Sequence, residues 1–375
     1  MSGDVKIGGL RRMVPSFERR GEDSVTGQYQ KYIFGKILFI LLCFVFVILI
    51  AGVSATIGSY DMSVLEVYGI ILDYIYRCII SFSWAEIDTV KEYVVLELRL
   101  PRIVMGIAGG MGLAIAGAAM QGIMKNPLAD PYTTGISAGA GFGAAIAIIL
   151  GVGAVVGEFA IVVNAFIFSL IPTFIIVTLT KIRRPTPSMM VLAGIATMYI
   201  FTAMTSLFMI SADPNAVQAV YIWTVGTLDK ASWSSLALVI PIVIIGASFL
   251  LAMARNLNVM GTGDEGAKSL GVQVDRTRVL ILGVISIMTA AIVSFSGVIG
   301  FIGLVSPHVV RIFLGSDNRY LIPASGLFGA ALLLGSDVIA RTIISPTILP
   351  VGIITAFIGG PLFLYLIMQR KKEVW

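Results

Sequence analysis

The stretch LRLPRIVMGIAGGMGLAIAGAAMQG, residues 98–122, decides the fold. Residues 103–122 carry no charge, and about 20 such residues are enough to cross a bilayer as a helix. A small residue recurs at every fourth position: Gly106, Gly110, Ala114, Ala118 and Gly122. Such a stripe allows another helix to approach the backbone closely. We therefore expect a membrane helix packed in the middle of a bundle, with a channel-lining helix as the alternative.

The composition of the rest of the chain also indicates a membrane protein. Of the 375 residues, 57% are apolar and 13% are charged, whereas soluble domains average about 45–50% and about 25%. The mean hydropathy is +0.96. These values exclude an ordinary soluble enzyme, a disordered chain and a nucleic-acid-binding domain. The net charge of +5 fits basic cytoplasmic loops, and two cysteines, Cys43 and Cys78, provide no disulfide framework or thiolate metal site.

Ten apolar runs predict ten membrane helices in an all-α polytopic protein. The first run covers residues 32–57, and it is too long for a secretory signal, so we expect an uncleaved first helix. The others begin near residues 101, 132, 158, 188, 233, 279, 297, 321 and 349. The two runs on either side of Ser296-Gly297 have one alternative interpretation, a single long span.

The distribution of charge predicts the orientation. Residues 57–98 carry seven acidic side chains but only Arg77 and Lys91 as basic ones, which suits an external segment. Within it, apolar residues at helical spacing predict an amphipathic surface helix. Residues 1–31, the segment Lys181-Ile-Arg-Arg184, the loop at residues 254–277 and the tail Arg370-Lys-Lys372 are polar or basic and suit the cytoplasm. Ten spans then place both termini in the cytoplasm.

The predicted spans contain almost no ionisable residue that could couple transport to an ion gradient. Asp337 is the main exception, with Arg341 one helical turn further on. The single histidine, His308, has no second His or Cys with which to hold a metal. Residues 261–269 resemble a phosphate-binding loop, but Ala267 separates the glycine from the lysine, so the match is false. Any energy for transport must therefore come from outside this chain, which indicates a partner that hydrolyses ATP.

Several motifs, taken together, resemble those of the FecCD-type permeases, the membrane subunits of ATP-binding-cassette (ABC) importers for iron chelates, haem and vitamin B12. The matching segments run in family order from about residue 35 to the C-terminus: Leu98-Arg-Leu-Pro-Arg102, Gly117-Ala-Ala-Met-Gln121, Asn126-Pro-Leu-Ala-Asp-Pro131, Gly135-Ile-Ser-Ala-Gly139, Trp223-Thr-Val-Gly226, residues 263–271, residues 300–308 and Leu349-Pro-Val-Gly352. The tail at residues 1–31 is longer than the family usually shows.

The resemblance implies an architecture and a set of partners. It implies a permease domain at residues 32–375, ten helices per subunit and a homodimeric type II importer in the cell (plasma or inner) membrane. Two cytoplasmic ATPase subunits and an external binding protein complete the transporter. Its other expected contacts are membrane lipids and a metal-chelate substrate. The resemblance implies no catalytic residue, cofactor or resident metal, and no nucleic acid.

The resemblance also implies three sets of functional residues. Arg99, Arg102 and Arg341 match outer-face arginines that dock the binding protein, and guanidinium suits carboxylate partners; alternatively these arginines anchor helix ends or pair locally, Arg341 with Asp337 and Arg99 with Glu97. The segment that couples to the ATPase comprises Gly263, Asp264, Glu265, Gly266, Ala267, Lys268, Ser269, Leu270 and Gly271. The translocation pathway between the fifth and tenth spans has as candidates Thr197, Thr202, Thr205, Ser206, Ile353 and Phe357.

We therefore expect the permease subunit of an ATP-driven, binding-protein-dependent importer for an iron(III) chelate (siderophore), haem or a corrinoid. One alternative is the same fold moving an oxyanion such as molybdate or tungstate. Two alternatives from other classes are an ion-coupled secondary carrier, which would depend on Asp337, and a membrane-embedded enzyme. The shortage of buried acids, histidines and cysteines argues against the enzyme.

Overall fold

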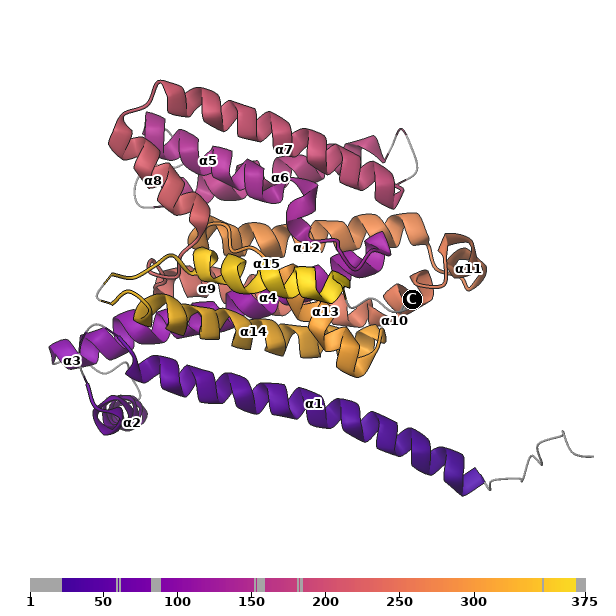
Figure 1. Cartoon of the computed structure of the whole chain (residues 1–375), viewed down its shortest axis with the longest axis horizontal. Coiled ribbons are helices and arrows are strands. Elements are labelled where there is room, and N and C mark those ends of the chain that lie inside the picture. Colours follow the sequence, from indigo (N-terminus) through magenta and orange to yellow (C-terminus); the bar gives the residue numbers. More distant parts are fainter. Residues whose placement is uncertain are drawn as a thin grey trace, which may run out of the picture.

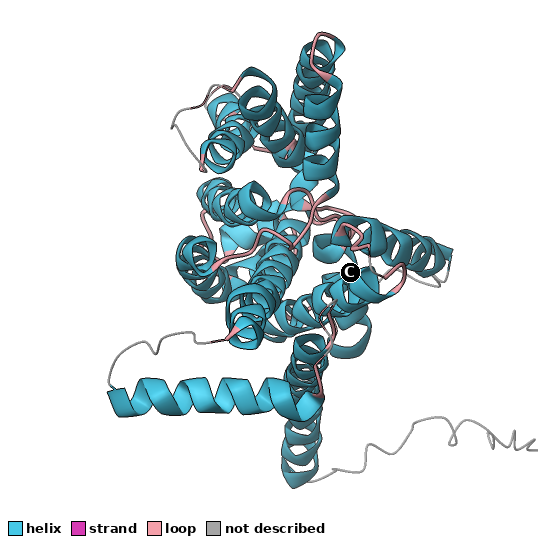
Figure 2. Cartoon of the chain, turned by 90° about the vertical axis from the view of Figure 1, so that its left-hand side faces the viewer, coloured by secondary structure: helices cyan, strands magenta, loops and turns pink. Residues whose placement is uncertain are grey.

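The structure is a computed structural model, and it describes residues 22–58, 60, 62–81, 89–151, 153, 159–180, 182, 185–345 and 347–368. Within these residues every regular element is a helix (Figures 1 and 2). Residues 1–21 of the predicted tail and the basic residues Lys181, Arg183, Arg184 and 370–372 lie outside the described residues.

Each of the ten apolar runs contains a helix in the described part of the chain. Their bounds are α1 (Glu22–Thr56), α4 (Leu100–Met124), α5 (Ile136–Leu150), α6 (Ala160–Leu179), α7 (Pro187–Ile210), α9 (Trp233–Ala252), α12 (Val274–Ser296), α13 (Ile302–Leu314), α14 (Asn318–Thr342) and α15 (Val351–Met368). Helices α1, α4, α6, α7, α9, α12 and α14 are long and apolar enough to span a membrane, while α5, α13 and α15 are shorter apolar helices. The chain is thus an all-helical, multi-span membrane protein, and a single long span across Ser296-Gly297 is excluded.

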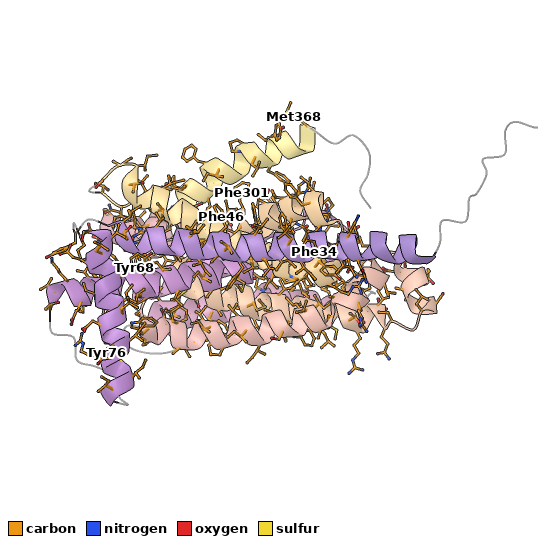
Figure 3. All side chains as sticks on the ribbon, turned by 90° about the horizontal axis from the view of Figure 1, so that it is seen from below. Phe34, Phe46, Tyr68, Tyr76, Phe301 and Met368 are labelled. Atoms are coloured by element: carbon orange, nitrogen blue, oxygen red, sulfur yellow. The ribbon has the colours of Figure 1, made fainter. Side chains whose placement is uncertain are left out.

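Shorter helices lie at the two ends of this bundle. At one end lie α2 (Val64–Ser81), α3 (Val90–Tyr93) and a π-helical turn, η1 (Val94–Arg99), and α10 (Ala254–Met260) and α11 (Asp264–Ser269) lie at the other (Figure 1). Helix α8 (Pro214–Val225) and the 3-10 turn η2 (Pro131–Thr134) complete the described elements. Helix α2 confirms the helix predicted within residues 57–98, and it lies across the direction of the long helices (Figures 2 and 3).

Helix α1 begins ten residues before the predicted first span. Its 35 residues correspond to about 52 Å at a rise of about 1.5 Å per residue, which exceeds the roughly 30 Å of the hydrocarbon core. Its N-terminal turns therefore extend beyond the hydrocarbon. Many of its apolar side chains, such as Phe34 and Phe46, are exposed along one side of the bundle (Figure 3), as expected for a helix that faces lipid.

Helix α4 is the central helix of the bundle, and its small residues explain why. It runs antiparallel to α14, and a Cβ atom added to Gly110 would lie 2.5 Å from the carbonyl oxygen of Gly329. Nearly all residues from Pro101 to Met124 are buried. The prediction of a buried packing helix is confirmed, because the stripe of small residues is used for backbone contact and not for lining a channel.

Three glycines at or near helix ends allow chain segments to approach one another closely inside the protein. Gly226 follows α8, Gly297 follows α12 and Gly352 lies in the first turn of α15. The Gly352 amide donates to the Gly226 carbonyl at 3.2 Å, and the Thr227 amide donates to the Ser296 carbonyl at 2.7 Å. Irregular backbone is tolerated at membrane depth where it is buried in protein and its polar groups are hydrogen-bonded. The chain can therefore leave the helical conformation between α12 and α13.

The contact between α4 and α14 yields a matched pair of substitutions. A Cβ atom on Gly329 would collide with α4, whereas one on Gly335, in the same helix, would meet nothing within 4 Å. We expect Gly329→Ala to lower the free energy of unfolding by about 1–3 kcal/mol because of overpacking. Gly335→Ala should leave it unchanged or raise it by up to about 1 kcal/mol, since alanine favours helix. Thermal unfolding of the purified variants measures both, and equal stabilities would contradict the proposed close contact.

Candidate functional site

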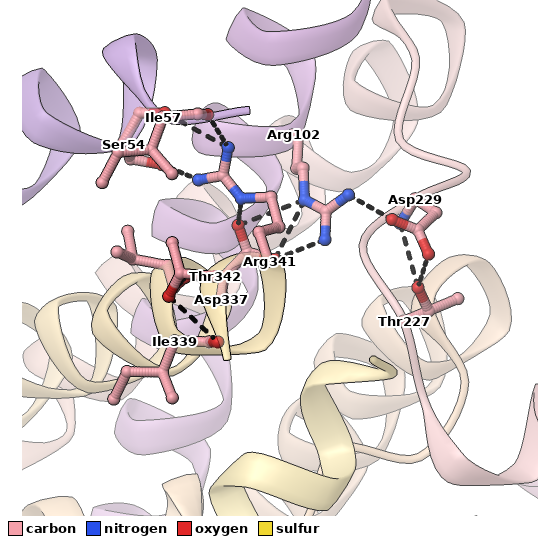
Figure 4. Close-up of polar contacts among 10 residues, drawn as sticks. Ser54, Ile57, Arg102, Thr227, Asp229, Asp337, Ile339, Arg341 and Thr342 are labelled. Carbon is pink, nitrogen blue, oxygen red and sulfur yellow. Dashed lines mark hydrogen bonds and ion pairs between the residues drawn. The ribbon is translucent and has the colours of Figure 1, made fainter. Parts of the chain in front are cut away.

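Four charged residues form a connected cluster at the end of the bundle where α2 lies: Arg102, Asp229, Asp337 and Arg341, the outer cluster (Figure 4). Arg102 donates to both carboxylate oxygens of Asp337, from Nε at 2.9 and 3.1 Å and from Nη2 at 2.7 Å. Arg341 approaches the same carboxylate, with Nε 3.0 Å from Oδ2. Nη1 of Arg102 pairs with Asp229 in the loop between α8 and α9. One fully buried carboxylate thus neutralises parts of two guanidinium groups.

The close contact between α4 and α14 places this cluster. The two helices run antiparallel, and Gly110 meets Gly329. Eight residues from that contact toward the same end of the bundle, α4 carries Arg102 and α14 carries Asp337. Eight residues are a little over two helical turns, so both side chains return to the face that the glycines share. The local sequence of each helix therefore brings together two charges that are 235 residues apart.

Two arginines also bind the last turn of α1. The Arg341 guanidinium donates to the carbonyls of Ser54 at 3.2 Å and Ile57 at 2.6 Å, and to the Ser54 hydroxyl. Arg99 donates to the carbonyls of Ala55 at 2.8 Å, Thr56 at 3.1 Å and Tyr60 at 2.6 Å. The final carbonyls of a helix have no intrahelical donor, so these contacts cap α1 and join it to η1 and α14.

The three predicted docking arginines are therefore engaged inside the protein. Arg99, Arg102 and Arg341 are all buried. The predicted local pair between Arg341 and Asp337 is present, whereas Arg99 donates to backbone carbonyls and not to Glu97. The most accessible ionic contact of the cluster is that of Arg102 with Asp229, whose side chain is 41% exposed. Binding-protein docking stays a prediction, and this is the contact at which an external carboxylate can compete.

A second ionic cluster lies at the opposite end of the bundle: Lys125, Asp264 and Arg278, the inner cluster. The Asp264 carboxylate accepts from Lys125 at 2.6 Å and from Arg278 at 3.0 and 3.2 Å. The Arg278 side chain is only 1% exposed, and it also donates to the carbonyls of Ile123 at 3.2 Å and Pro185 at 2.6 Å. One arginine of α12 therefore joins the start of α11, the end of α4 and the residue two positions before α7.

The predicted coupling segment, residues 263–271, projects from this inner cluster. It contains α11, whose residue Ala267 is buried against the protein. Leu270 is 69% exposed, and the Glu265 side chain is 90% exposed. Gly263 and Gly271 have φ angles of 116° and 85°, which other residues rarely adopt. The segment is thus an exposed helical turn between two glycine joints, attached to the bundle through Asp264.

Burial alone would raise the pKa of Asp264, but hydrogen bonds from Lys125 and Arg278 outweigh it and lower that pKa below the ordinary value. The carboxylate is therefore charged at neutral pH. Because its pKa is lower in the folded state, its contribution to stability is complete above the ordinary aspartate pKa and is lost as the pH falls through the folded value.

The predicted pathway residues do not share one surface. Thr202, Ser206 and Phe357 are exposed, and Thr205 and Ile353 are partly exposed. Thr197 is buried, and its hydroxyl donates to the carbonyls of Ala193 at 3.0 Å and Gly194 at 2.9 Å. Thr197 therefore lies off the exposed face of α7, and its place on a pathway stays a prediction.

Sequence reasoning missed three members of the two clusters: Asp229, Lys125 and Arg278. Arg278 had a usable signal, because it is a charged residue directly before a predicted apolar run. Lys125 and Asp229 lie in connecting segments, and nothing local to them identifies their distant partners. Within the described residues, no group of three or more His, Cys, Asp and Glu side chains could hold a metal ion.

Comparison with known proteins identifies the family of the chain. Residues 41–369 match the model of the FecCD transport family. The cobalamin import system permease protein of Halobacterium salinarum is 43% identical over 281 residues, which cover 75% of this chain and 74% of that protein. The hemin transport system permease protein of Yersinia pestis is 38% identical over 284 residues, covering 74% and 84%. A solved structure described as an inward-facing, metal-chelate type ABC transporter aligns with a TM-score of 0.77 and 28% identity, covering 88% of this chain and 99% of that one.

The inner cluster gives a prediction with a pH dependence. We expect Asp264→Asn to lower the free energy of unfolding by about 1–3 kcal/mol at pH 7, the range for a lost hydrogen bond to a charged group. The difference from the unaltered protein should shrink below about pH 4, where the carboxylate of the unfolded chain takes up a proton, and it should vanish once the pH has fallen below the lower pKa of the folded state. The control is Glu265→Gln, because that carboxylate is exposed and should matter little. Denaturant unfolding at several pH values measures both, and a difference that stays constant at low pH would contradict the assignment.

Proposed function

We propose, since the chain belongs to the FecCD transport family, that it forms the membrane pathway of a binding-protein-dependent, ATP-driven importer of a corrinoid, haem or an iron(III) siderophore. The chain is an ABC transporter permease subunit of the type II fold, and it is not itself catalytic. The observation that carries the proposal is the family match over residues 41–369, which include both ionic clusters. Two relatives named for cobalamin and hemin support the substrate class.

The outer cluster favours an ATP-driven importer over an ion-coupled carrier. A carrier of protons or sodium ions needs an acidic group deep in the bundle that can gain and lose its cation. The buried Asp337 lies near one end, held by Arg102 and Arg341. Two guanidinium groups occupy the oxygens of this carboxylate, so it is not available to bind and release a transported ion. Energy from a partner ATPase is the consistent alternative.

For the assembly we propose ten membrane helices per subunit, both termini in the cytoplasm and a homodimer around a central pathway. Helices α7 and α15 carry large apolar side chains that are exposed in the isolated chain, among them Tyr199, Leu207, Phe357 and Tyr365. Thr202 and Ser206 add mild polarity to the face of α7, and the Ser206 hydroxyl donates to the Thr202 carbonyl at 3.0 Å. A large chelate needs a wide lining that binds weakly, so these residues suffice without any metal ligand.

For coupling we propose that residues 263–271 seat in the cytoplasmic ATPase subunits. Leu270 offers an apolar contact and Lys268 a charged one, both outside the bundle. Because Arg278 joins this segment to the carbonyls of Ile123 and Pro185, a movement of α11 is passed to the ends of α4 and α7 through short hydrogen bonds. The same contacts make the segment stiff enough to transmit force.

The function is tested by reconstitution. The permease alone in liposomes is expected neither to hydrolyse ATP nor to take up radiolabelled cyanocobalamin, haem or a ferric siderophore. Addition of the ATPase and binding protein encoded beside it should give ATP-dependent uptake of one of the three, with cyanocobalamin tested first. Lys268→Glu combined with Leu270→Glu should lower that uptake at least tenfold at equal insertion, because like charges and a lost apolar contact oppose seating.

The matched control for the double variant is Asn215→Glu, an exposed acidic substitution at the other end of the bundle, which should retain uptake. ATP hydrolysis by the permease without any partner would overturn the importer assignment. Unchanged uptake by the double variant would overturn the coupling segment alone.

We propose that the binding protein docks by carboxylate exchange at Arg102. Asp229 occupies the accessible side of that guanidinium, and a carboxylate of the binding protein takes its place. We expect Asp229→Asn to strengthen binding-protein association about threefold to tenfold, because it removes a competing pair of moderate strength. The gain should appear mainly as faster association at low salt. Asp213→Asn makes the same change in net charge at the same end of the bundle and is the control. The rates of binding-protein association are measured on both variants in nanodiscs, and equal rates would contradict the replacement of Asp229 by a carboxylate of the binding protein.

A further inference from the structure

An apolar groove lies where the crosswise helix α2 meets the beginnings of α4 and α9. It has a volume of about 810 Å³. Ile71, Tyr74 and Ile75 of α2 line one side, and Trp233 and Ile240 of α9 line another. The groove is separate from both ionic clusters and from the exposed faces of α7 and α15. None of the functions described above uses it.

The position of the groove along α9 matches the depth of one leaflet, from its headgroups into its hydrocarbon. Trp233 is the first residue of α9, and its indole N–H donates to the carbonyl of Leu96 at 3.0 Å. Tryptophan and tyrosine concentrate at the level of the lipid headgroups. From Trp233 to Pro241, which also lines the groove, the helix rises by about 12 Å at about 1.5 Å per residue. One end of the groove therefore lies at headgroup level and the other in the hydrocarbon.

The depth and the lining determine what fills the groove. α9 is one of the helices able to span the membrane, and Leu238 on the same turn is exposed to its surroundings. An apolar groove open to hydrocarbon excludes water, because water would lose its hydrogen bonds there without compensation. A lipid acyl chain forms no hydrogen bonds, so it can occupy the groove without losing any.

One charged side chain, Glu97, also lines the groove at its headgroup end. It is half-buried, and among the described residues it has no hydrogen-bond or ion-pair partner. The nearby basic side chains are engaged elsewhere: Lys91 with Glu66 at 2.6 Å, Arg77 with Asp73 at 2.9 Å and Arg99 with backbone carbonyls. A partly desolvated carboxylate favours a cation beside it. The groove thus combines an acyl-chain slot with a site for positive charge.

We propose that this groove binds one membrane lipid with an amine headgroup, its acyl chain between α2 and α9 and its ammonium group on Glu97. An anionic headgroup is disfavoured because Glu97 repels it. The bound lipid fills the space between α2 and the bundle and so holds α2 against α4 and α9.

The test is native mass spectrometry of the full-length protein exchanged from detergent into mixtures of dioleoyl phosphatidylethanolamine and dioleoyl phosphatidylglycerol. The unaltered protein should retain one phosphatidylethanolamine per chain, in preference to phosphatidylglycerol by about tenfold. Glu97→Gln should remove the preference while a lipid is still retained. Ala237→Trp, which fills the groove, should abolish retention, whereas Leu238→Trp, at the neighbouring exposed position outside the groove, should not.

Melting temperatures provide a second readout. Phosphatidylethanolamine should raise the melting temperature of the unaltered protein and of Leu238→Trp, and should leave that of Ala237→Trp unchanged. Equal retention of both lipids by the unaltered protein would overturn the headgroup assignment. The absence of a retained lipid, or equal retention by Ala237→Trp, would overturn the site, including the case in which a second copy of the chain fills the groove.

Discussion

The close backbone contact of α4 with α14 is the constraint on which the rest of the structure depends. At Gly110 and Gly329 no side chain separates the two helices, and this fixes both their distance and their register. The register in turn brings Arg102 to Asp337, and Arg341, one turn further along α14, to the end of α1. A one-residue slip would rotate each charged side chain about 100° away from its partner and leave a charge buried without a counter-charge. Sterically strict packing at the glycines and the cost of unpaired buried charge therefore select the same register.

Helix α4 also connects the two ends of the protein. From Arg102 in the outer cluster to Lys125 in the inner cluster it spans about 35 Å at about 1.5 Å per residue. Because this helix is enclosed on nearly all sides, it cannot bend without disturbing several neighbours. Asp264 and Arg278 attach residues 263–271 to its inner end. The helix and its attachments at both ends are therefore built as one stiff unit, which suits the proposed coupling of this permease to an ATPase.

The sequence predicted the helical fold well, because membrane helices are governed by local composition. Ten apolar runs contain ten helices, the small-residue stripe identifies the buried helix, and the apolar periodicity within residues 57–98 identifies α2. What the sequence does not predict depends on distant partners. Nothing near Arg102 in the chain indicates that Asp229 and Asp337, 127 and 235 residues away, pair with it. The sequence locates the helix that carries Thr197, but which side of α7 faces Gly135 is set by the packing of η2 and α5.

The two carboxylates on Arg102 differ in a way that makes the proposed docking role compatible with a buried arginine. Asp337 is fully enclosed, so its removal would leave a buried charge unpaired, at a cost of about 3–5 kcal/mol. Asp229 is partly exposed, so solvent screens its charge, and its removal leaves Arg102 still paired with Asp337. An incoming carboxylate can therefore replace Asp229 at little cost while Asp337 continues to hold α4 against α14. The loop that carries Asp229 leads directly from α8, whose end packs on Ser296 and Gly352 through backbone hydrogen bonds. Release of Asp229 would thus free the loop that is hydrogen-bonded to the junction of α8, α12 and α15. The contact between Gly110 and Gly329 would not be disturbed.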